Sequence, residues 1–527
     1  MNFSYKDIFE KKYFPIILIF FFTLILYSPS IKIPFVNDEI SFIQRNQPAN
    51  ISELFGLFNK KDYDGYYYRP IGNFVSGLST LVFNYDYVYY RILNILLHAA
   101  AGILLYYFLY YLLSDNNKRR AIALFAALFF IAFPLNDYVI FWQTDLFDRL
   151  MLIFYLAGLL SFIKQKLKPG FLSLLFFLLS MMSKEMAFSF PLIIFLITYF
   201  FTNDSKKIYK SILTSLPYVA LMGIFILLRI IIFHNDVFTA KDAHSSGTLI
   251  DVIKNYSLFS GLLVFPFFIR EVQYFFLSHK LLTSILLLPV AITVIYFLIK
   301  RIRRELLLLF FILFIVLTIA PASRLFLRWY LYLPEVGFAA FLSYLVFMSK
   351  FKYNKLSYIL AAAILLIYSS SLALKEKSWV INTETSVSLL KDFINSSRDE
   401  IVKSGEVNFL TVPAKVDDIP IFQLGFDKLF NFYGGFKKPI TVNLYSKSYL
   451  ASLSDSISSF MQGNNLVLSQ IDDNYFILFN NGKNLNFESN NFMNENRNRL
   501  TIELKELKNK VLFTFSKGKF IRYKESQ

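Results

Sequence analysis

The chain has 527 residues, of which 56% are hydrophobic, 19% aromatic and only 17% charged, and its mean hydropathy is +0.48. These values exclude an ordinary soluble domain, and the lack of cysteine excludes disulfides and thiolate metal sites. A net charge of +17 would suit a nucleic-acid partner. Because many basic residues fall in short loops between apolar runs, the positive-inside rule for membrane proteins explains this charge better.

Repeated apolar runs of about 17–22 residues are long enough to cross a hydrocarbon core roughly 30 Å thick. The sequence therefore predicts a polytopic α-helical membrane protein with about 11 transmembrane helices. The expected spans are 13–31, 91–113, 120–135, 149–164, 170–183, 186–202, 211–233, 281–299, 305–321, 332–349 and 356–374. The first run follows Lys6, Lys11 and Lys12 as in a signal peptide, but we expect it to stay as an anchor.

Basic loops set the expected orientation. Runs rich in Lys and Arg at 118–120, 164–168, 206–207, 300–304 and 350–352 alternate with loops that contain fewer of them. If every basic loop is cytoplasmic, the N-terminus is inside and the C-terminus outside. The short apolar stretch 256–269, interrupted by Pro266, is then an interfacial or re-entrant helix on the outer side.

Three regions are expected outside the membrane: a first loop at 32–90, a stretch at 235–280 and a tail after Leu374. The uncharged stretch 71–83 in the first loop is short and is expected to lie along the membrane surface. The domains are then a membrane module at 1–375 and an extracytoplasmic domain at 376–527. Abundant Lys, Asn, Ile, Phe and Tyr are typical of an AT-rich genome, which favours a bacterial cytoplasmic membrane.

The tail alternates polar helical patterns with short strand-like runs, which predicts a small α/β domain. The expected helices are 383–404 and 448–462, and the expected strands are 407–412, 440–444, 466–470, 475–479 and 511–515. Asn480-Asn481-Gly482 is a turn signal. No catalytic motif stands out in this region, so we expect a structural module or one that docks an acceptor.

Ionisable residues near the expected outer ends of the spans are the candidates for chemistry, because charges at the bilayer boundary usually line a cavity or pair with each other. Asp38 and Glu39 form an acidic pair where the first loop leaves the membrane, and a carboxylate can take a proton from an acceptor hydroxyl. Arg69, Lys184 and Arg328 could hold a phosphate, since Arg offers a bidentate fork and Lys a point charge. Together these groups suit transfer from a lipid phosphate.

Each candidate also has an ordinary structural explanation. Lys184 and Glu185 could be a charge pair in a short hairpin, and Arg69 before Pro70 could be an interfacial anchor. Asp145 and Asp148 share a face if their segment is helical, or they are simply solvated. Arg328 sits among aromatic residues and could make a cation–π contact in an aromatic belt.

Five stretches in the same order over roughly residues 14–375 resemble one family, the GT-C-type integral membrane glycosyltransferases. The likeness is greatest to the transmembrane O-mannosyltransferases that carry tetratricopeptide repeats, and to their bacterial relatives. The stretches are Phe35-Val36-Asn37-Asp38-Glu39; Tyr68-Arg69-Pro70 with 90–99, which includes His98; Phe133-Pro134 with Trp142 and Asp148; 179–187 around Ser183-Lys184-Glu185; and Trp329-Tyr330-Leu331-Tyr332-Leu333-Pro334-Glu335.

The chain departs from the family pattern at several positions. The two histidines around the proline of the third stretch appear here as Phe133 and Asn136, and an arginine two residues before Asp148 appears as Leu146. The acidic-basic pair before the Tyr-Leu-Tyr-Leu-Pro run appears as Arg328-Trp329, and the tail replaces the tetratricopeptide repeats.

The resemblance implies a polyprenyl- or dolichyl-phosphate-linked sugar as donor and a first-loop aspartate, matching Asp38, as the base. Displacement at the anomeric carbon would invert its configuration, and Glu39 would raise the pKa of Asp38 or orient the acceptor. His98, Asp145, Asp148 and Glu185 are further cavity candidates. No cofactor is required, and although the acids are numerous enough for a divalent cation, their spacing does not demand one. The acceptor is a glycan, a lipid or a protein.

Two other functions compete with this one. A transporter or flippase of lipid-linked glycans fits the membrane location. However, the mid-span positions are almost free of charge, and the sequence shows no inverted repeat or paired broken helices. A non-catalytic scaffold that displays the C-terminal domain leaves the acidic loop and the order of the stretches unexplained.

Overall fold

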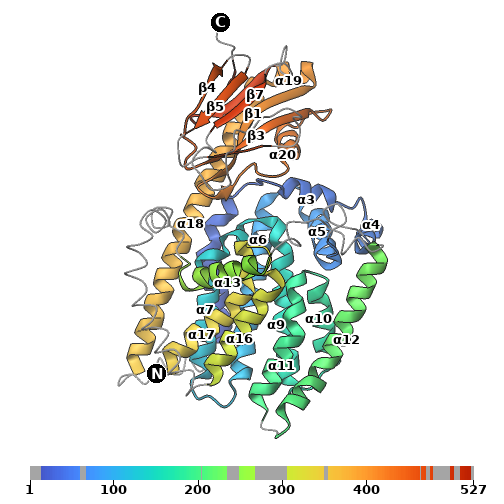
Figure 1. Cartoon of the computed structure of the whole chain (residues 1–527), viewed down its shortest axis with the longest axis vertical. Coiled ribbons are helices and arrows are strands. Elements are labelled where there is room, and N and C mark those ends of the chain that lie inside the picture. Colours follow the sequence, from blue (N-terminus) through green and yellow to red (C-terminus); the bar gives the residue numbers. More distant parts are fainter. Residues whose placement is uncertain are drawn as a thin grey trace, which may run out of the picture. The chain divides into compact units, whose positions relative to one another are not determined.

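The computed structural model describes residues 13–59, 67–202, 205–233, 248–266, 306–348, 354–462, 465–470, 475–478, 499–503 and 511–523. Its contacts divide the chain into two units. Figure 1 labels helices and strands of both. The first contains Met1–Ser28, Pro48–Val82 and Tyr90–Lys375, and the second contains Pro29–Gln47, Phe83–Tyr89 and Glu376–Gln527. The second unit thus includes the part of the first loop that carries Asp38 and Glu39.

Within the residues that the structure describes, the regular elements of the first unit are helices. Its α-helices are α2 (Phe14–Tyr27), α4 (Ile51–Gly56), α5 (Pro70–Phe83), α6 (Tyr87–Leu112), α7 (Arg119–Ile131), α8 (Asp137–Phe141), α9 (Leu146–Lys164), α10 (Phe171–Met181), α11 (Phe190–Phe201), α12 (Lys207–Phe233), α13 (Leu249–Val264), α16 (Leu306–Ile319) and α17 (Pro334–Met348). Short 3₁₀ turns η4 (Pro134–Asn136), η5 (Gln143–Asp145), η6 (Glu185–Ser189) and η9 (Arg328–Tyr332) join several of them. The first residues of α6 belong to the second unit.

Five helical segments in the described part of the chain are long and apolar enough to cross a membrane, which is compatible with a membrane protein. They are Phe14–Lys32, Tyr87–Leu112, Gln143–Lys164, Lys207–Ile231 and Lys355–Ser396. The pair Arg119–Ile131 and Pro134–Phe141 passes the same test together, with a bend of 44° between its halves, and would raise the count to six.

Four more of the expected spans coincide with apolar helices that are only 10–17 residues long, at Phe171–Met181, Glu185–Phe201, Leu306–Ala322 and Pro334–Met348. At 1.5 Å per residue, a helix of 11 residues reaches only about 16 Å, which is shorter than the hydrocarbon core. The span expected at 281–299 lies outside the described residues. The count of 11 spans therefore stays a prediction.

Aromatic and aliphatic side chains fill the interior of the first unit. α9 packs against α10, α11 against α12, and α17 against both α7 and α16. One buried cluster joins residues from well-separated segments: Ala132, Phe133, Leu135, Phe259, Leu263, Ile319, Leu331 and Tyr368. Phe133, at a position where the resembled family has histidine, thus packs in this cluster against Tyr368, with ring centroids 5.7 Å apart.

The second unit is an α/β domain. Its larger sheet has the order β6-β3-β1-β8-β9, with β1 (Glu406–Val416) parallel to β3 (Thr441–Leu450) and to β8 (Leu512–Ser516). Antiparallel neighbours complete it: β2 (Ile419–Pro420), β6 (Tyr475–Leu478) and β9 (Lys519–Arg522). A separate antiparallel sheet contains β4 (Ile457–Gln462), β5 (Asn465–Gln470) and β7 (Arg499–Glu503).

Helices cover the larger sheet through aromatic contacts. α18 (Asn354–Ser396) continues across the division between the units, and its residue Phe393 contacts the ring of Phe409 on β1 at 5.5 Å. α20 (Phe426–Gly434) supplies Phe426 and Phe430, whose rings lie 5.3 and 5.8 Å from Phe409. The short helices α3 (Glu39–Arg45) and α19 (Arg398–Ser404) complete the unit.

The expected helix at 448–462 is wrong. Residues 441–450 form β3, and 457–462 form β4. Between them, the carboxylate of Asp455 accepts hydrogen bonds from the backbone amides of Ala451 and Ser452, at 2.9 Å each. Ser and Asp side chains that bond nearby backbone favour turns over helix interiors, so this segment turns and each arm joins a sheet. The expected turn at Asn480-Asn481-Gly482 lies outside the described residues.

Candidate functional site

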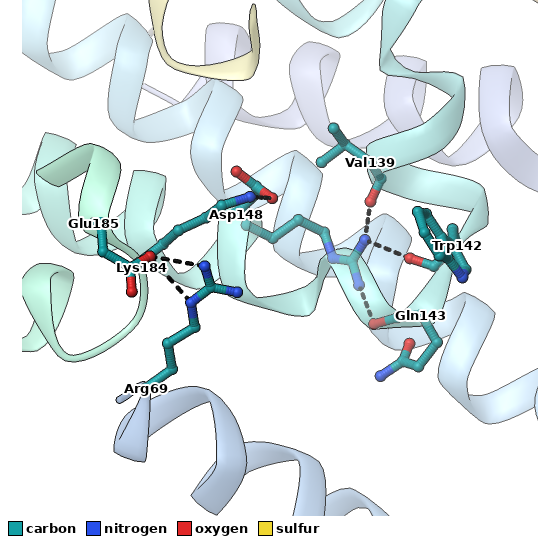
Figure 2. Close-up of polar contacts among 8 residues, drawn as sticks. Arg69, Val139, Trp142, Gln143, Asp148, Lys184 and Glu185 are labelled. Atoms are coloured by element: carbon teal, nitrogen blue, oxygen red, sulfur yellow. Dashed lines mark hydrogen bonds and ion pairs between the residues drawn. The ribbon is translucent and has the colours of Figure 1, made fainter. Parts of the chain in front are cut away.

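Arg69 and Glu185 form an ion pair that joins the second and fourth of the five stretches that resemble the glycosyltransferase family, called the motif stretches below. Arg69 precedes Pro70, the first residue of α5, and Glu185 begins η6. The Nε and Nη2 atoms of Arg69 donate to the Oε2 atom of Glu185 at 3.1 and 2.7 Å (Figure 2). Arg229, from α12, approaches the other carboxylate oxygen, with its Nη1 atom 3.6 Å from Oε1. One carboxylate thus holds two guanidinium groups.

Lys184 forms a second, more deeply buried ion pair with Asp148. The Nζ atom of Lys184 donates to the Oδ2 atom of Asp148 in the first turn of α9 (Figure 2). Only 5% and 1% of their side-chain surfaces are exposed. The same Nζ atom lies 4.8 Å from the ring centroid of Tyr330 on η9. Tyr330 also interacts electrostatically with Arg69 and Glu185, so the two ion pairs and this tyrosine form one group.

We call this group the basic cluster: Arg69, Asp148, Lys184, Glu185, Arg229 and Tyr330. Its ionised members carry three positive and two negative charges. Burial lowers the pKa of Arg69, but the charge and hydrogen bond of Glu185, together with the nearby Tyr330 and Tyr67, outweigh burial and the pKa is raised. The Oδ1 atom of Asp148 is buried and has no hydrogen-bond partner among the described residues. The cluster can therefore hold an anion and also offers a carboxylate oxygen.

Close packing fixes the segments that carry the cluster. The amide of Ile71 donates to the carbonyl oxygen of Met182 at 3.2 Å, which ties the start of α5 to the segment before Lys184. Gly72 lies so close to Phe147 that an added Cβ would sit 2.0 Å from the ring. The same ring lies 5.1 Å from the guanidinium carbon of Arg69. Glycine at position 72 thus lets α5 approach the residue next to Asp148.

Arg149 supports the segment that leads into α9. It is fully buried and donates to the carbonyl oxygens of Val139, Trp142 and Gln143, the last two at 3.4 and 3.5 Å (Figure 2). Asp145, a predicted cavity residue, is buried and interacts electrostatically with Arg149. These contacts hold the short connection between α8 and α9 in place.

Arg328 belongs to a neighbouring group that joins the third and fifth motif stretches. Its Nη2 atom lies 3.2 Å from the Oδ2 atom of Asp137, and its guanidinium carbon lies 3.8 Å from the ring centroid of Tyr138. One residue earlier, Asn136 donates to Glu335 at 3.1 Å. Asn136, at the other position where the resembled family has histidine, therefore still connects the two stretches.

His98 lies in an aromatic pocket of the interior. Its Nδ1 atom is 2.9 Å from the hydroxyl of Tyr332 and its Nε2 atom 3.4 Å from the carbonyl oxygen of Ile131. The rings of Tyr27 and Phe130 flank it at 5.1 Å each. This histidine thus connects the second and fifth motif stretches, and both of its nitrogens have protein partners.

Asp38 and Glu39 lie in the second unit, whereas the basic cluster lies in the first. Asp38 precedes α3 at its N-cap position and is 6% exposed. Glu39 is fully buried, and its Oε2 atom accepts a hydrogen bond from the amide of Val36 at 2.9 Å. Glu39 thus closes the turn that presents Asp38, which is a structural role that the sequence did not indicate.

Sequence reasoning also missed Arg229, because a single arginine near the end of an apolar helix resembles an ordinary interfacial anchor.

Within the described ranges, no group of three or more His, Cys, Asp or Glu residues is arranged to bind a metal ion. No protein-family model and no curated protein matches this sequence. The resemblance to the GT-C-type glycosyltransferases therefore rests on the motif stretches alone.

Proposed function

We propose that this protein is a membrane glycosyltransferase, which moves a sugar from a polyprenyl-phosphate-linked donor to an acceptor hydroxyl on the extracytoplasmic face. The basic cluster carries this proposal. Residues from four separate motif stretches meet there, and the cluster combines an excess of positive charge with the buried carboxylate of Asp148 and the half-buried carboxylate of Glu185. Buried charges of this kind within a membrane protein usually mark a substrate pathway.

The donor's phosphate is the anion that this cluster would bind. Arg69 already presents two N–H groups to one carboxylate oxygen, and the same fork matches a phosphate oxygen. Lys184 contributes a point charge. Glu185 and Asp148 hold the cations in place before the donor arrives, while the polyprenyl chain remains in the bilayer.

In the proposed reaction, Asp38 takes the proton of the acceptor hydroxyl as its oxygen bonds to the anomeric carbon. The bond between that carbon and the phosphate oxygen breaks, and its electron pair leaves with the polyprenyl phosphate. The cations of the basic cluster stabilise the charge that develops on this leaving group. Attack from the opposite side inverts the anomeric configuration.

The proposal is tested with purified protein in proteoliposomes and a labelled polyprenyl-phosphate sugar. Wild type should transfer the label to an acceptor, and Arg69→Gln should raise the donor KM by about 10–100-fold, as expected for a lost charge-assisted hydrogen bond. Arg119→Gln is the matched control, because Arg119 lies outside the cluster over the ring of Tyr110. Movement of labelled donor across the bilayer without sugar transfer would instead indicate a transporter.

A further inference from the structure

The turn that presents Asp38 has an unusual backbone. Asn37 has a φ of 56°, in the left-handed region that few residues other than glycine, asparagine and aspartate adopt. Such conformations persist only where surrounding contacts enforce them, and they are common at functional sites. Here the enforcing contacts come from a segment almost 400 positions later in the chain, within the same unit.

Asn37 is bonded on both sides to the loop 421–425 between β2 and α20. Its amide donates to the carbonyl oxygen of Ile421 at 2.6 Å, and its Oδ1 atom accepts from the amide of Leu424 at 2.6 Å. Nearby, the hydroxyl of Tyr433 donates to the carbonyl oxygen of Phe35 at 2.7 Å. These three bonds fix the backbone on the N-terminal side of Asp38.

Gly425 fixes the other side. It has a φ of +62° and is the N-cap residue of α20. An added Cβ would lie 2.5 Å from the Oγ atom of Ser41 and 3.1 Å from the Cα atom of Asp38. Both its backbone conformation and its surroundings therefore require glycine. The loop 421–425 packs directly on the backbone of Asp38.

We infer that Asn37 and Gly425 are positioning residues for Asp38, so that the C-terminal α/β domain is part of the catalytic unit and not an accessory. The loop 421–425 sets the position of the Asp38 carboxylate by holding its backbone. This inference rests on the proposed function for its effect on catalysis, but its structural half is independent of any activity.

The Nδ2 atom of Asn37 is consistent with this role. It is buried and has no hydrogen-bond partner among the described residues. An unpaired buried N–H group is unfavourable, so a bound oxygen beside Asp38 would satisfy it. The hydroxyl of an acceptor offers such an oxygen.

Two measurements on the full-length protein test the inference: hydrogen exchange of residues 36–45 and sugar-transfer kinetics. Asn37→Gly keeps the left-handed backbone but removes the acceptor for Leu424, and Gly425→Ala pushes on Asp38 directly. Both should raise exchange in 36–45 and lower kcat on the order of 10²-fold, the effect of displacing a reacting group by about 1 Å. The donor KM should stay at the wild-type value.

Two variants serve as controls. Gly435→Ala imposes similar strain at the other end of α20, since Gly435 has a φ of +55° but no atom within 4 Å of an added Cβ. It should leave both measurements at wild type. Asn37→Asp retains an oxygen that accepts from the Leu424 amide, so hydrogen exchange of residues 36–45 in this variant should stay at the wild-type level.

Unchanged exchange in Asn37→Gly and Gly425→Ala, or an equal increase in Gly435→Ala, would overturn the inference. If wild type transfers no sugar, the proposed function fails. The exchange pattern still decides in that case whether Asn37 and Gly425 hold the Asp38 segment.

Discussion

The charges of the basic cluster are paired between residues that lie far apart in the sequence. Arg69 and Glu185 are separated by 116 positions, and Asp148 and Lys184 by 36. Removing one partner of the buried Lys184–Asp148 pair leaves the other charge uncompensated, which typically costs about 3–5 kcal/mol. The Arg69–Glu185 pair is partly exposed, so its loss should cost less. Substitutions here therefore affect stability as well as binding, which is why conservative changes such as Arg69→Gln need a stability measurement beside the kinetic one.

Lys447 provides a pH-dependent test of the second unit. It is buried on β3 and donates to the carbonyl oxygen of Gln423, in the loop that holds Asn37. Burial lowers its pKa to about 8, although Asp427 opposes the shift. Between that value and the unfolded pKa of about 10.4, the unfolded chain binds more protons. Stability should therefore rise as the pH increases through this window and change little below it.

We expect amide protection factors in β1 and β3 to increase by about tenfold between pH 8 and pH 10 because of this group. The variant Lys447→Met has no amine to titrate, so its protection factors should not show this increase between pH 8 and pH 10. Hydrogen exchange corrected for intrinsic rates measures both. An identical pH profile in the variant would show that Lys447 does not titrate in this range.

At the scale of elements, the close contact between α5 and α9 is the feature most open to test. Gly72→Ala would place a methyl group 2.0 Å from Phe147. Overpacking of this kind costs about 1–3 kcal/mol and shifts the neighbouring backbone. Because Phe147 precedes Asp148 and lies beside Arg69, we expect a lower melting temperature together with weaker donor binding.

Gly223→Ala in α12 is the matched control for this change. An added Cβ there meets no atom within 4 Å, and alanine is about 1 kcal/mol more favourable than glycine inside a helix. It should raise or preserve the melting temperature. Equal destabilisation by both variants would contradict the packing argument.

The sequence predicted elements well where one local pattern decides the outcome. Long apolar runs such as 211–233 are helices in the structure, and the hydrophobic run 407–412 lies inside β1. It failed at 448–462, where the pairing of β3 with β1 and of β4 with the following strand β5 outweighed a helical pattern. For the cluster, residue types near Arg69 and Lys184 were informative, but nothing local showed which carboxylate each would meet. The contact of Asn37 with loop 421–425 depends on tertiary folding and has no local signal.

At the scale of the whole molecule, the expected orientation can be tested directly, because the chain contains no cysteine. Asn117 and Lys403 are both exposed and lie in the first and second unit, respectively. If the basic loops are cytoplasmic and the second unit is outside, only Lys403→Cys should react with an impermeant thiol reagent in intact cells. Asn117→Cys should react only after the membrane is permeabilised.

If only Asn117→Cys is labelled in intact cells, the orientation is the opposite of the expected one. If Asn117→Cys and Lys403→Cys are both labelled, the two positions lie on the same side of the membrane, which contradicts the expected topology. The orientation matters for chemistry. An extracytoplasmic Asp38 would act where nucleotide sugars are not available, and a lipid-linked sugar is then the natural donor.

We propose that Asp38 removes the proton of an acceptor while the basic cluster holds a lipid-linked donor. The most direct measurement compares sugar transfer from labelled polyprenyl-phosphate sugar by wild type and by Asp38→Asn, which keeps the size of the side chain but removes the base. General-base catalysis contributes about 10²–10⁴-fold, so the variant should lose that factor in kcat while its donor KM stays unchanged. Transfer by Asp38→Asn at the wild-type rate would contradict the account.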